Sequence, residues 1–304
     1  MRVPATRIRP KVKARLIDGM LLIDKPAGIT SHDVVSAARR ALRTRRIGHA
    51  GTLDPFATGL LVLLTGHATR LLPHLRGEPK VYDATIVFGS ETDTDDVTGT
   101  VVRTADLPDE ARVREAIASL TGAIEQVPPA YSAKQVDGQR AYAAARRGVA
   151  LQLDAVRVDV HQWEVREFTG GLLRATITCG GGTYIRALAR DLGRLSGSAA
   201  HLGALRRVRS GSFDVADAMT IDRLQLGDVN PRPAIEALPH LPAITLSTAD
   251  VAHVRQGRTV EVAGDGASHD PMAALVDDAG RLVAVAERAG AAWQPRVVLP
   301  DVEA

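Results

Sequence analysis

The alternation of apolar and polar positions predicts strands and helices in mixed order along most of the chain. Two short unbroken apolar runs, at residues 19–23 and 60–64, are bounded by turn residues and predict buried strands. Residues 80–89 alternate between apolar and polar side chains and predict a strand with one solvent-exposed face. Further strands are predicted at residues 156–168 and 172–179.

Three segments have the spacing of amphipathic helices. The first begins at Thr30 and Ser31, which can cap a helix, and Asp33 stands at capping-box spacing from Thr30. A second helix is predicted at residues 109–121 and a third from Thr183 through Leu192. Residues 126–151 differ in composition, because they are rich in proline and basic side chains. We expect them to form a basic insertion that extends from the core, with some helix at 141–147.

The last third of the chain changes character after a proline-rich stretch, which we interpret as a linker at residues 231–242. Short β-like runs follow at 259–262, 273–276, 282–286 and 296–299, separated by Gly and Asp turns. They predict a small β-barrel of about 60 residues, a size at which independent stability is marginal. Residues 240–304 carry five arginines against nine acidic residues, so this module is acidic.

The segment from Arg46 to Gly59 has the composition of a binding loop. Glycines at 48, 51 and 59 permit positive φ and a close approach of the backbone to a ligand. Pro55 holds Asp54 in an extended or turn conformation, beside His49 and just before an apolar run. One carboxylate is thus presented on a shaped loop, although an Asp-Pro pair is more often an ordinary turn.

Charge is distributed unevenly along the chain. The formal net charge is +3, yet residues 1–50 contain twelve basic against three acidic residues. Such a block predicts a polyanionic partner, most simply a nucleic acid, with a solvated arm as the alternative for the first residues. The single Cys179 fits a reducing compartment, and no apolar run has the length of a membrane span or a signal-peptide core, so we expect a cytoplasmic protein.

Residues 90–99 form an acidic run with Glu91, Asp93, Asp95 and Asp96. The run lacks the glycine and glutamate spacing of a calcium-binding loop. We therefore expect a solvated loop there.

Several motifs, taken together and in order, resemble the bacterial tRNA pseudouridine(55) synthases of the TruB family. They run from about residue 19 to about residue 210, and their order along the chain makes them more specific than any one alone. The motifs are Gly19-Met-Leu-Leu-Ile-Asp-Lys-Pro-Ala-Gly-Ile-Thr-Ser31, Gly48-His-Ala-Gly-Thr-Leu-Asp-Pro-Phe-Ala-Thr-Gly59, Tyr82 on its strand, Pro128-Pro-Ala-Tyr-Ser-Ala-Lys134, Gly182-Thr-Tyr-Ile-Arg-Ala-Leu-Ala-Arg-Asp-Leu-Gly193 and His201 with Leu205-Arg-Arg207.

The resemblance implies an α+β fold, with a large catalytic domain built on a central mixed, mainly antiparallel sheet flanked by helices. It also implies that the C-terminal β-barrel is a PUA-like domain. We expect a basic arm at residues 1–18, the catalytic domain at 19–238 with an RNA-gripping insertion at 126–151, and the PUA-like domain at 243–304.

The resemblance further implies that the chain isomerises one uridine, position 55 in the TΨC loop of tRNA, to pseudouridine. The C1′–N1 bond is cleaved, the base turns over and a C1′–C5 bond forms. Nothing is oxidised and no group is lost, so we expect no redox cofactor and no metal. We expect tRNA as the partner, a monomer, no membrane and no obligatory protein partner.

Three residues would carry the chemistry by resemblance. Asp54 is the carboxylate, which is ionised at neutral pH unless its surroundings perturb it. Arg186 would keep Asp54 ionised and aimed through a charge-assisted contact. Tyr82 would stack on the everted uracil, and its hydroxyl is the candidate proton acceptor. Without the resemblance, Tyr82 would be a core residue and Arg186 a surface helix arginine.

Other residues would bind the substrate by resemblance. His49 would occupy the space left by the everted nucleotide, and Tyr184 and Leu205 would wall the base pocket. Lys25 would mainly brace the catalytic loop. Basic residues that follow the family's motifs would complete the RNA contacts: Lys134, Arg206 and Arg207. Residues 180–182 are all glycine where the family often has a polar or basic residue, so one phosphate contact is in doubt.

Two other functions are compatible with the same residues. One is an RNA-binding or RNA-folding module, which would have no need of Asp54, and the other is a synthase that works in a guide-RNA particle. The sequence leaves three routes open for Asp54: attack at C1′, addition to C6, or assistance of an elimination through a glycal.

Overall fold

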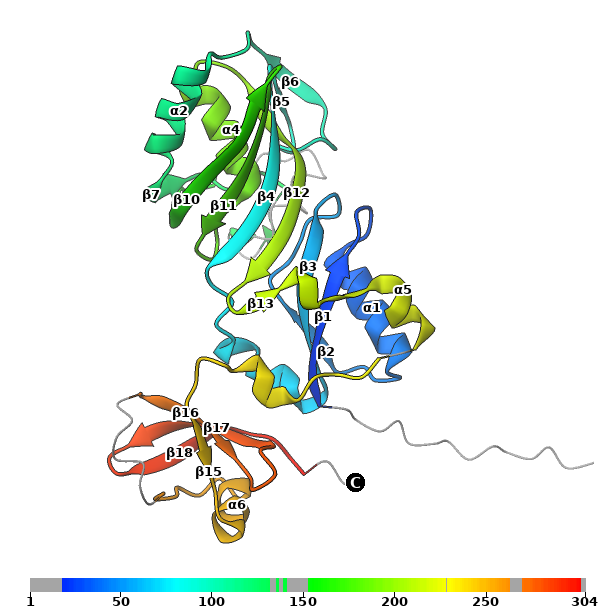
Figure 1. Ribbon diagram of the computed structural model, residues 1–304, viewed down its shortest axis with the longest axis vertical. Helices are drawn as coiled ribbons and strands as arrows, with labels where there is room; N and C mark the ends of the chain where they lie inside the picture. Colours follow the sequence, from blue (N-terminus) through cyan, green and yellow to red (C-terminus); the bar gives the residue numbers. More distant parts are fainter. Residues whose placement is uncertain are drawn as a thin grey trace, which may run out of the picture.

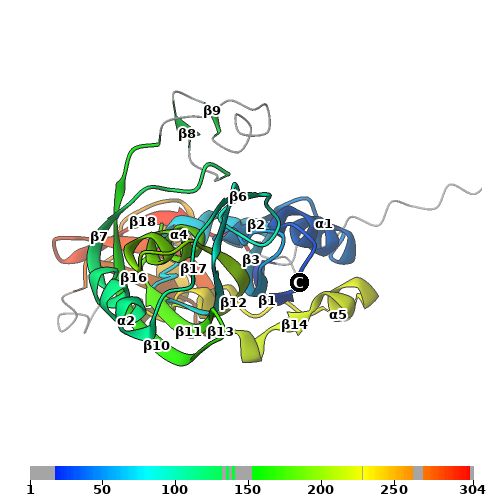
Figure 2. The ribbon, with the colours of Figure 1, turned by 90° about the horizontal axis from the view of Figure 1, so that it is seen from above.

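A computed structural model of the chain describes residues 18–131, 135–136, 139–140, 153–227, 229–262 and 270–301. These residues form three tiers in Figure 1, in which the upper and middle tiers share one large sheet and a small sheet forms the lower tier. Strands β8 (Gln135–Val136) and β9 (Gln139–Arg140) pair with each other outside this body, as the view from above shows (Figure 2). Residues 1–17 of the predicted basic arm and the predicted helix at 141–147 lie outside the described residues.

The large sheet is mixed, as predicted. Its main path follows the order β14-β1-β3-β12-β4-β11-β10-β7, with β2 paired to β3 and β13 paired to β12. The β1/β14 and β3/β12 pairs are parallel, and the other pairs of this sheet are antiparallel. The strands are β1 (Gly19–Lys25), β2 (Ile47–Ala50), β3 (Thr58–Thr65), β4 (Lys80–Phe88), β7 (Gly122–Gln126), β10 (Val156–Thr169), β11 (Leu172–Cys179), β12 (Ala200–Ser210), β13 (Phe213–Asp214) and β14 (Met219–Thr220).

Helices cover the large sheet and supply its core. In the upper tier α2 (Glu110–Ser119) and α4 (Ile185–Leu195) pack on β4, β10, β11 and β12 (Figure 1). In the middle tier α1 (Ser31–Ala41) and α5 (Ile221–Leu226) pack on β1 and β3. The predicted capping box at the start of α1 is confirmed, because Thr30 Oγ1 accepts from the Asp33 amide and the Asp33 carboxylate accepts from the Thr30 amide.

Strand β12 is the longest element that the sequence pattern does not predict. The pattern indicates only a basic stretch there. The strand joins the two halves of the sheet, because it pairs with β4 along most of its length and with β3 at Arg206 and Arg207. Its alternation is obscured by arginines that have partners, among them Arg206 with Asp24 and Arg209 with Asp214. A charged side chain is costly in a central strand, but an ion pair with a partner offsets that cost.

The acidic run at residues 90–99 is folded inward, so the prediction of a solvated loop is wrong. It contains β5 (Ser90–Thr92), which pairs with β6 (Val101–Thr104). The side chains of Glu91, Asp95 and Asp96 are buried. Each of the three pairs with an arginine of α4, so their burial is compensated.

The lower tier is a four-stranded sheet in the order β15-β16-β17-β18. The described strands do not show the predicted barrel, although an isolated bridge joins Val260 to Trp293. The elements are β15 (Ala243–Thr245), α6 (Thr248–Arg255), β16 (Met272–Val276), β17 (Leu282–Ala289) and β18 (Ala292–Val298). The pattern of short apolar runs predicts β16, β17 and β18 but not β15 or α6.

The described residues also contain the 3₁₀ helices η1 (Gly66–His74), η2 (Val215–Asp217) and η3 (Ala234–Ala237). The proline-rich stretch is packed rather than a free linker, because Arg232 exchanges backbone hydrogen bonds with Met20. One apolar cluster joins Met20 and Leu22 of the large sheet to Val285 and Val297 of the small one. Among the described residues, no helix combines the length and apolar character needed to cross a bilayer.

Candidate active site

The loop between β2 and β3 is fastened from behind, which fixes the direction of Asp54. Ser31 Oγ accepts from the Leu53 amide at 2.9 Å and donates to the Leu53 carbonyl at 3.1 Å. The Lys25 ammonium donates to three carbonyls, those of Pro26, Ile29 and Pro55, at 2.9, 2.8 and 3.2 Å. The loop therefore has the rigid support that a catalytic side chain requires.

Lys25 is fully buried under this loop. Burial lowers the pKa of the Lys25 ammonium to about 8, against the opposing charge of Asp54. Because backbone carbonyls occupy its donors, Lys25 supports the loop and has no donor left for RNA.

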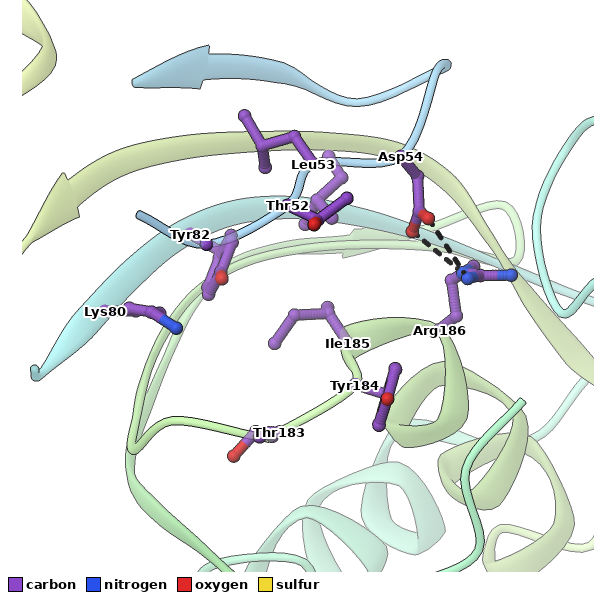
Figure 3. A pocket seen from close by; sticks show the side chains of 12 residues that line it. Thr52, Leu53, Asp54, Lys80, Tyr82, Thr183, Tyr184, Ile185 and Arg186 are labelled. Carbon is purple, nitrogen blue, oxygen red and sulfur yellow. Dashed lines mark hydrogen bonds and ion pairs between the residues drawn. The ribbon is translucent and has the colours of Figure 1, made fainter. Parts of the chain in front are cut away.

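Asp54 is paired with Arg186 at the N-terminal end of α4 (Figure 3). Arg186 Nε lies 3.0 Å from Asp54 Oδ2, and Nη2 lies 3.2 Å from Oδ1, so the contact is bidentate. Burial raises the pKa of the Asp54 carboxyl, Arg186 acts to lower it, and the nearby carboxylate of Asp96 raises it. The guanidinium is thus the main group that keeps Asp54 ionised in a partly dry site.

Arg186 is itself held by backbone carbonyls as well as by acids. It donates to the carbonyl of Thr94 at 2.9 Å and to that of Tyr131 at 2.8 Å, and its Nη1 lies 3.5 Å from Asp96 Oδ2. Its side chain is only 5% exposed. The guanidinium is therefore fixed before any substrate arrives.

The arginines of α4 continue this arrangement along one face of the helix. Arg186, Arg190 and Arg194 are four residues apart and so share a face. They pair in turn with Asp96, Asp95 and Glu91 of the acidic run, at 3.5, 2.9 and 2.7 Å. We call this set the arginine ladder. It fastens residues 91–96 to the helix that carries Arg186.

The start of the predicted insertion is tied to the same helix. Gln126 and Tyr184 exchange two hydrogen bonds, from the Tyr184 amide to Gln126 Oε1 at 2.9 Å and from Gln126 Nε2 to the Tyr184 carbonyl at 3.1 Å. Arg190 donates to the Val127 carbonyl at 2.8 Å. Together with the Arg186–Tyr131 bond, these contacts anchor residues 126–131.

A pocket of about 270 Å³ opens beside Asp54. It brings together five of the predicted residues, from the catalytic loop, β4, α4 and β12: Asp54, Tyr82, Tyr184, Arg186 and Leu205. Burial raises the pKa of the Tyr82 phenol, and the charge of Arg207 acts against that rise. A flat apolar wall with an ionised carboxylate at one end is suited to a planar, polar base.

The pocket also contains residues to which the sequence prediction gave no role, among them Lys80, Thr183 and Ile185. Lys80 stands two residues before Tyr82 on β4, so both side chains project from the same face of the strand. That spacing is the signal that could have found it. Thr183 and Ile185 flank Tyr184 and enter the pocket with it (Figure 3).

The remaining predicted residues that the structure describes do not line the pocket. His49 is half-buried on β2, and its Nδ1 has no hydrogen-bond partner among the described residues. Arg206 makes a bidentate ion pair with Asp24, at 3.0 and 2.8 Å. Lys134 lies outside the described residues.

Arg207 is 1% exposed and donates to the carbonyls of Leu60 and Gly51, at 2.8 and 3.1 Å. Its burial argues against the direct RNA contact that we expected. Gly59 is needed where the Arg207 backbone passes, because its φ is +101° and a side chain there would overlap the backbone of Arg207. Among the described residues, no group of three or more His, Cys, Asp and Glu side chains is placed to hold a metal ion.

Solved structures share this fold. The chain superposes on a structure of a Cbf5–Nop10–Gar1 complex with a TM-score of 0.68 and 26% identity, over 92% of this chain and 84% of the other. It also superposes on a structure of an H/ACA RNP bound to a substrate RNA containing 2′-deoxyuridine, with a TM-score of 0.69 and 24% identity, over 94% and 86% of the two chains. The second likeness shows the fold alone.

Two family models match consecutive parts of the chain, and both describe pseudouridylate synthases, the class that the fold and the pocket define. Residues 39–185 match the N-terminal domain of TruB family pseudouridylate synthase, and residues 186–229 match the C-terminal domain of tRNA pseudouridylate synthase B. The tRNA pseudouridine synthase B of Thermobifida fusca is 45% identical, over 93% of this chain and 99% of that protein. That of Arthrobacter sp. is 43% identical, over 93% and 97%. The chain therefore belongs to the TruB family of pseudouridylate synthases.

Proposed function

We propose that the protein isomerises uridine 55 in the TΨC loop of tRNA to pseudouridine. The observation that carries the proposal is the bidentate Asp54–Arg186 pair at the end of a pocket walled by Tyr82. The identity to tRNA pseudouridine synthases B over nearly the whole chain supports the same substrate. The rival functions, an RNA-folding module and a guide-dependent synthase, become outcomes of the test.

The target base must leave the RNA stack to reach Asp54, at a cost of a few kcal/mol. Stacking on an aromatic ring returns about 1–3 kcal/mol per base, and Tyr82 offers such a ring. His49, on the strand that leads into the loop of Asp54, would occupy the space that the base has left. Its Nδ1 is buried and has no hydrogen-bond partner among the described residues.

The reaction breaks C1′–N1, turns the base and joins C1′ to C5, after which the C5 proton leaves and N1 takes up a proton. Asp54 takes part as an ionised carboxylate, by attack at C1′, by addition to C6, or by assisting elimination through a glycal. If the Tyr82 hydroxyl accepts the C5 proton, it must act as the phenolate, and Arg207 is the cation that favours that form. In this proposal Arg207 acts on Tyr82 in place of the RNA contact first expected.

The rest of the chain would hold the tRNA. In this proposal residues 19–238 form the catalytic domain, the insertion at 126–151 grips the RNA with Lys134, and the C-terminal tier from 243 to 304 is a PUA-like domain. Arg206 lies at the surface, where it can exchange Asp24 for a phosphate. The enzyme would act as a monomer in the cytoplasm, without cofactor, guide RNA or protein partner.

The test is the yield of pseudouridine from a bare TΨC stem-loop transcript. The wild type should convert the target uridine, and Asp54→Asn, which keeps the shape but not the charge, should form no product. Asp222→Asn, an exposed position on α5, is the matched control and should behave as the wild type.

Three results would contradict the proposal. Product from Asp54→Asn would remove Asp54 from the chemistry. RNA folding by the wild type without product would favour the folding module. Conversion that requires an added guide RNA would favour the guide-dependent particle.

A further inference from the structure

Lys80 places a cation in the pocket with no protein partner. Its side chain lines the pocket on the side away from Asp54 and Arg186, beside Tyr82 (Figure 3). Within the described part of the chain, its ammonium makes no hydrogen bond and has no carboxylate within 4.0 Å. A half-buried ammonium that is neither paired nor fully hydrated is costly, so such a group needs a functional explanation.

The surroundings of Lys80 increase that cost. A Cβ at Gly51 would lie 3.7 Å from the Lys80 ammonium nitrogen and 3.3 Å from Arg207 Nη1, so both cations approach the backbone of the catalytic loop. Burial and the charge of Arg207 lower the pKa of Lys80, while Cys179 and Glu78 act in the opposite direction. A negatively charged group that enters the pocket would therefore lower the cost of burying the Lys80 ammonium.

The other cations near the pocket are already engaged. Arg186 is occupied by Asp54 and by the carbonyls of Thr94 and Tyr131. Arg207 donates to the carbonyls of Leu60 and Gly51. Lys80 is therefore the cation that remains available to a ligand among the described residues that line the pocket.

The proposed reaction, on which this inference rests, creates negative charge on the base. When C1′–N1 breaks, the electron pair stays on N1 and spreads to the carbonyl oxygens O2 and O4 of the detached uracil. If Asp54 adds to C6 instead, the electron pair of the C5–C6 bond moves toward C5 and O4. In each case the electron pair is used when C5 bonds to C1′. The C5 proton then leaves and N1 takes up a proton, and in the second route the bond between Asp54 and C6 also breaks.

We propose that Lys80 is a catalytic residue that donates a hydrogen bond to a carbonyl oxygen of the everted uracil and stabilises the negative charge that develops on the base. A preorganised donor aimed at developing charge in a partly dry site acts more strongly on the transition state than on the bound substrate. Lys80 and Asp54 thus serve opposite ends of one nucleotide.

The test separates the chemical step from RNA binding. Lys80→Met removes the charge and keeps the length, Lys80→Arg keeps the charge, and Arg114→Met on the outer face of α2 is the control. Single-turnover rates at saturating stem-loop and the Kd for the same RNA are measured at one salt concentration. We expect Lys80→Met to lose about 10²–10³-fold in rate, as for loss of one donor to a developing anion. Its Kd should change by less than about threefold, and Lys80→Arg should recover most of the rate.

Several outcomes would overturn the inference without touching the proposed function, provided that the wild type makes pseudouridine and Asp54→Asn does not. A rate within about threefold of wild type in Lys80→Met would show that the charge is not used. A higher Kd with an unchanged saturating rate would assign Lys80 to a phosphate contact. Thermal unfolding is measured alongside, because a melting temperature lowered equally in Lys80→Met and Lys80→Arg, with equal rate losses, would assign Lys80 a structural role.

Discussion

Asp54 and Asp96 share the guanidinium of Arg186, and this sharing sets the charge state of the site. Arg186 contacts Asp54 through two nitrogens and Asp96 at 3.5 Å. Two backbone carbonyls hold the same side chain, so its place does not depend on Asp54. Asp54 can therefore move toward the substrate while its counter-ion stays in position.

The pKa of Asp54 leads to a prediction for the pH profile. Burial and the charge of Asp96 raise this pKa, so the rate should fall with decreasing pH above the value for a free carboxyl. Asp96→Asn removes a like charge, which favours the ionised form of Asp54. The acid limb of the single-turnover rate should therefore move to lower pH in Asp96→Asn, with a reduced plateau because Arg186 loses a partner.

The profile is measured from pH 4 to 8, with RNA binding followed at each pH as a control. An acid limb that stays in place, or that moves to higher pH, would show that Asp96 does not act on Asp54 through its charge.

At the scale of elements, the arginine ladder makes α4 and the acidic run one unit. Glu91 has an exposed fraction of 4% and accepts from Arg194 and Arg103. Burial acts to raise the pKa of Glu91, but the hydrogen bonds from Arg194 and Arg103 outweigh it and hold the pKa below its ordinary value. A carboxyl with a lowered pKa in the folded state adds stability above its unfolded pKa, and this is lost as pH falls through the folded pKa.

Glu91→Gln should therefore lower the free energy of unfolding by about 1–3 kcal/mol at neutral pH, the cost of breaking a charged, buried hydrogen-bond set. The difference from wild type should shrink as the pH falls below about 4.3, the value for an unfolded glutamate. Glu110→Gln is the matched control, because its pair with Arg114 is exposed and worth about 0.3–0.5 kcal/mol. Urea unfolding at several pH values measures both, and equal effects of the two changes would contradict the ladder.

The elements that the sequence predicts correctly are those whose pattern is local. The capping box at Thr30 and the alternation of β4 are visible within ten residues. The acidic run is misread because its partners on α4 lie 95 and 103 residues further along the chain, as for Asp95 with Arg190 and Glu91 with Arg194. Strand β12 is missed for a related reason, since the acid that pairs with Arg206 stands on β1.

The site divides in the same way. Family motifs mark Asp54, Tyr82 and Arg186, and the fold brings them to one pocket. The burial of Arg207 and the lack of a partner for Lys80 depend on how β4, β12 and the catalytic loop meet, which no local pattern records.

At the scale of the whole molecule, the lower tier is seated against the middle one. Arg70 of η1 donates to the carbonyl of Val298 at 2.7 Å, beside the apolar cluster that spans the two tiers. Four exposed arginines lie in the last turn of α1 and just after it: Arg40, Arg43, Arg45 and Arg46. Strand β2 leads from this group to the catalytic loop, a span of about 13 Å at the usual rise per residue.

This group predicts a salt-dependent contact with RNA. The side chains of Arg45 and Arg46 make no ion pair within the described part of the chain. If each neutralises one phosphate, the double variant Arg45→Gln/Arg46→Gln should reduce the slope of log affinity against log salt by about 1.4–1.8, at about 0.7–0.9 per contact. Filter binding of the stem-loop between low and moderate salt measures the slope.

Deleting residues 1–15 should reduce the slope further if the basic arm also meets phosphates. An unchanged slope in the double variant would place the RNA elsewhere, and an unchanged slope after the deletion would make the arm a solvated tail.

The bond from Arg186 to the Tyr131 carbonyl limits how the chain can vary outside the pocket. Residues 126–131 are hydrogen-bonded to the start of α4 and its arginines at Gln126, Val127 and Tyr131. These bonds fix the length of the segment between them. One residue added between Val127 and Tyr131 would move a carbonyl out of reach of its arginine, and Arg186, the counter-ion of Asp54, would lose one of its hydrogen bonds. We therefore expect a residue inserted between Val127 and Tyr131 to lower the activity with every predicted catalytic side chain still present.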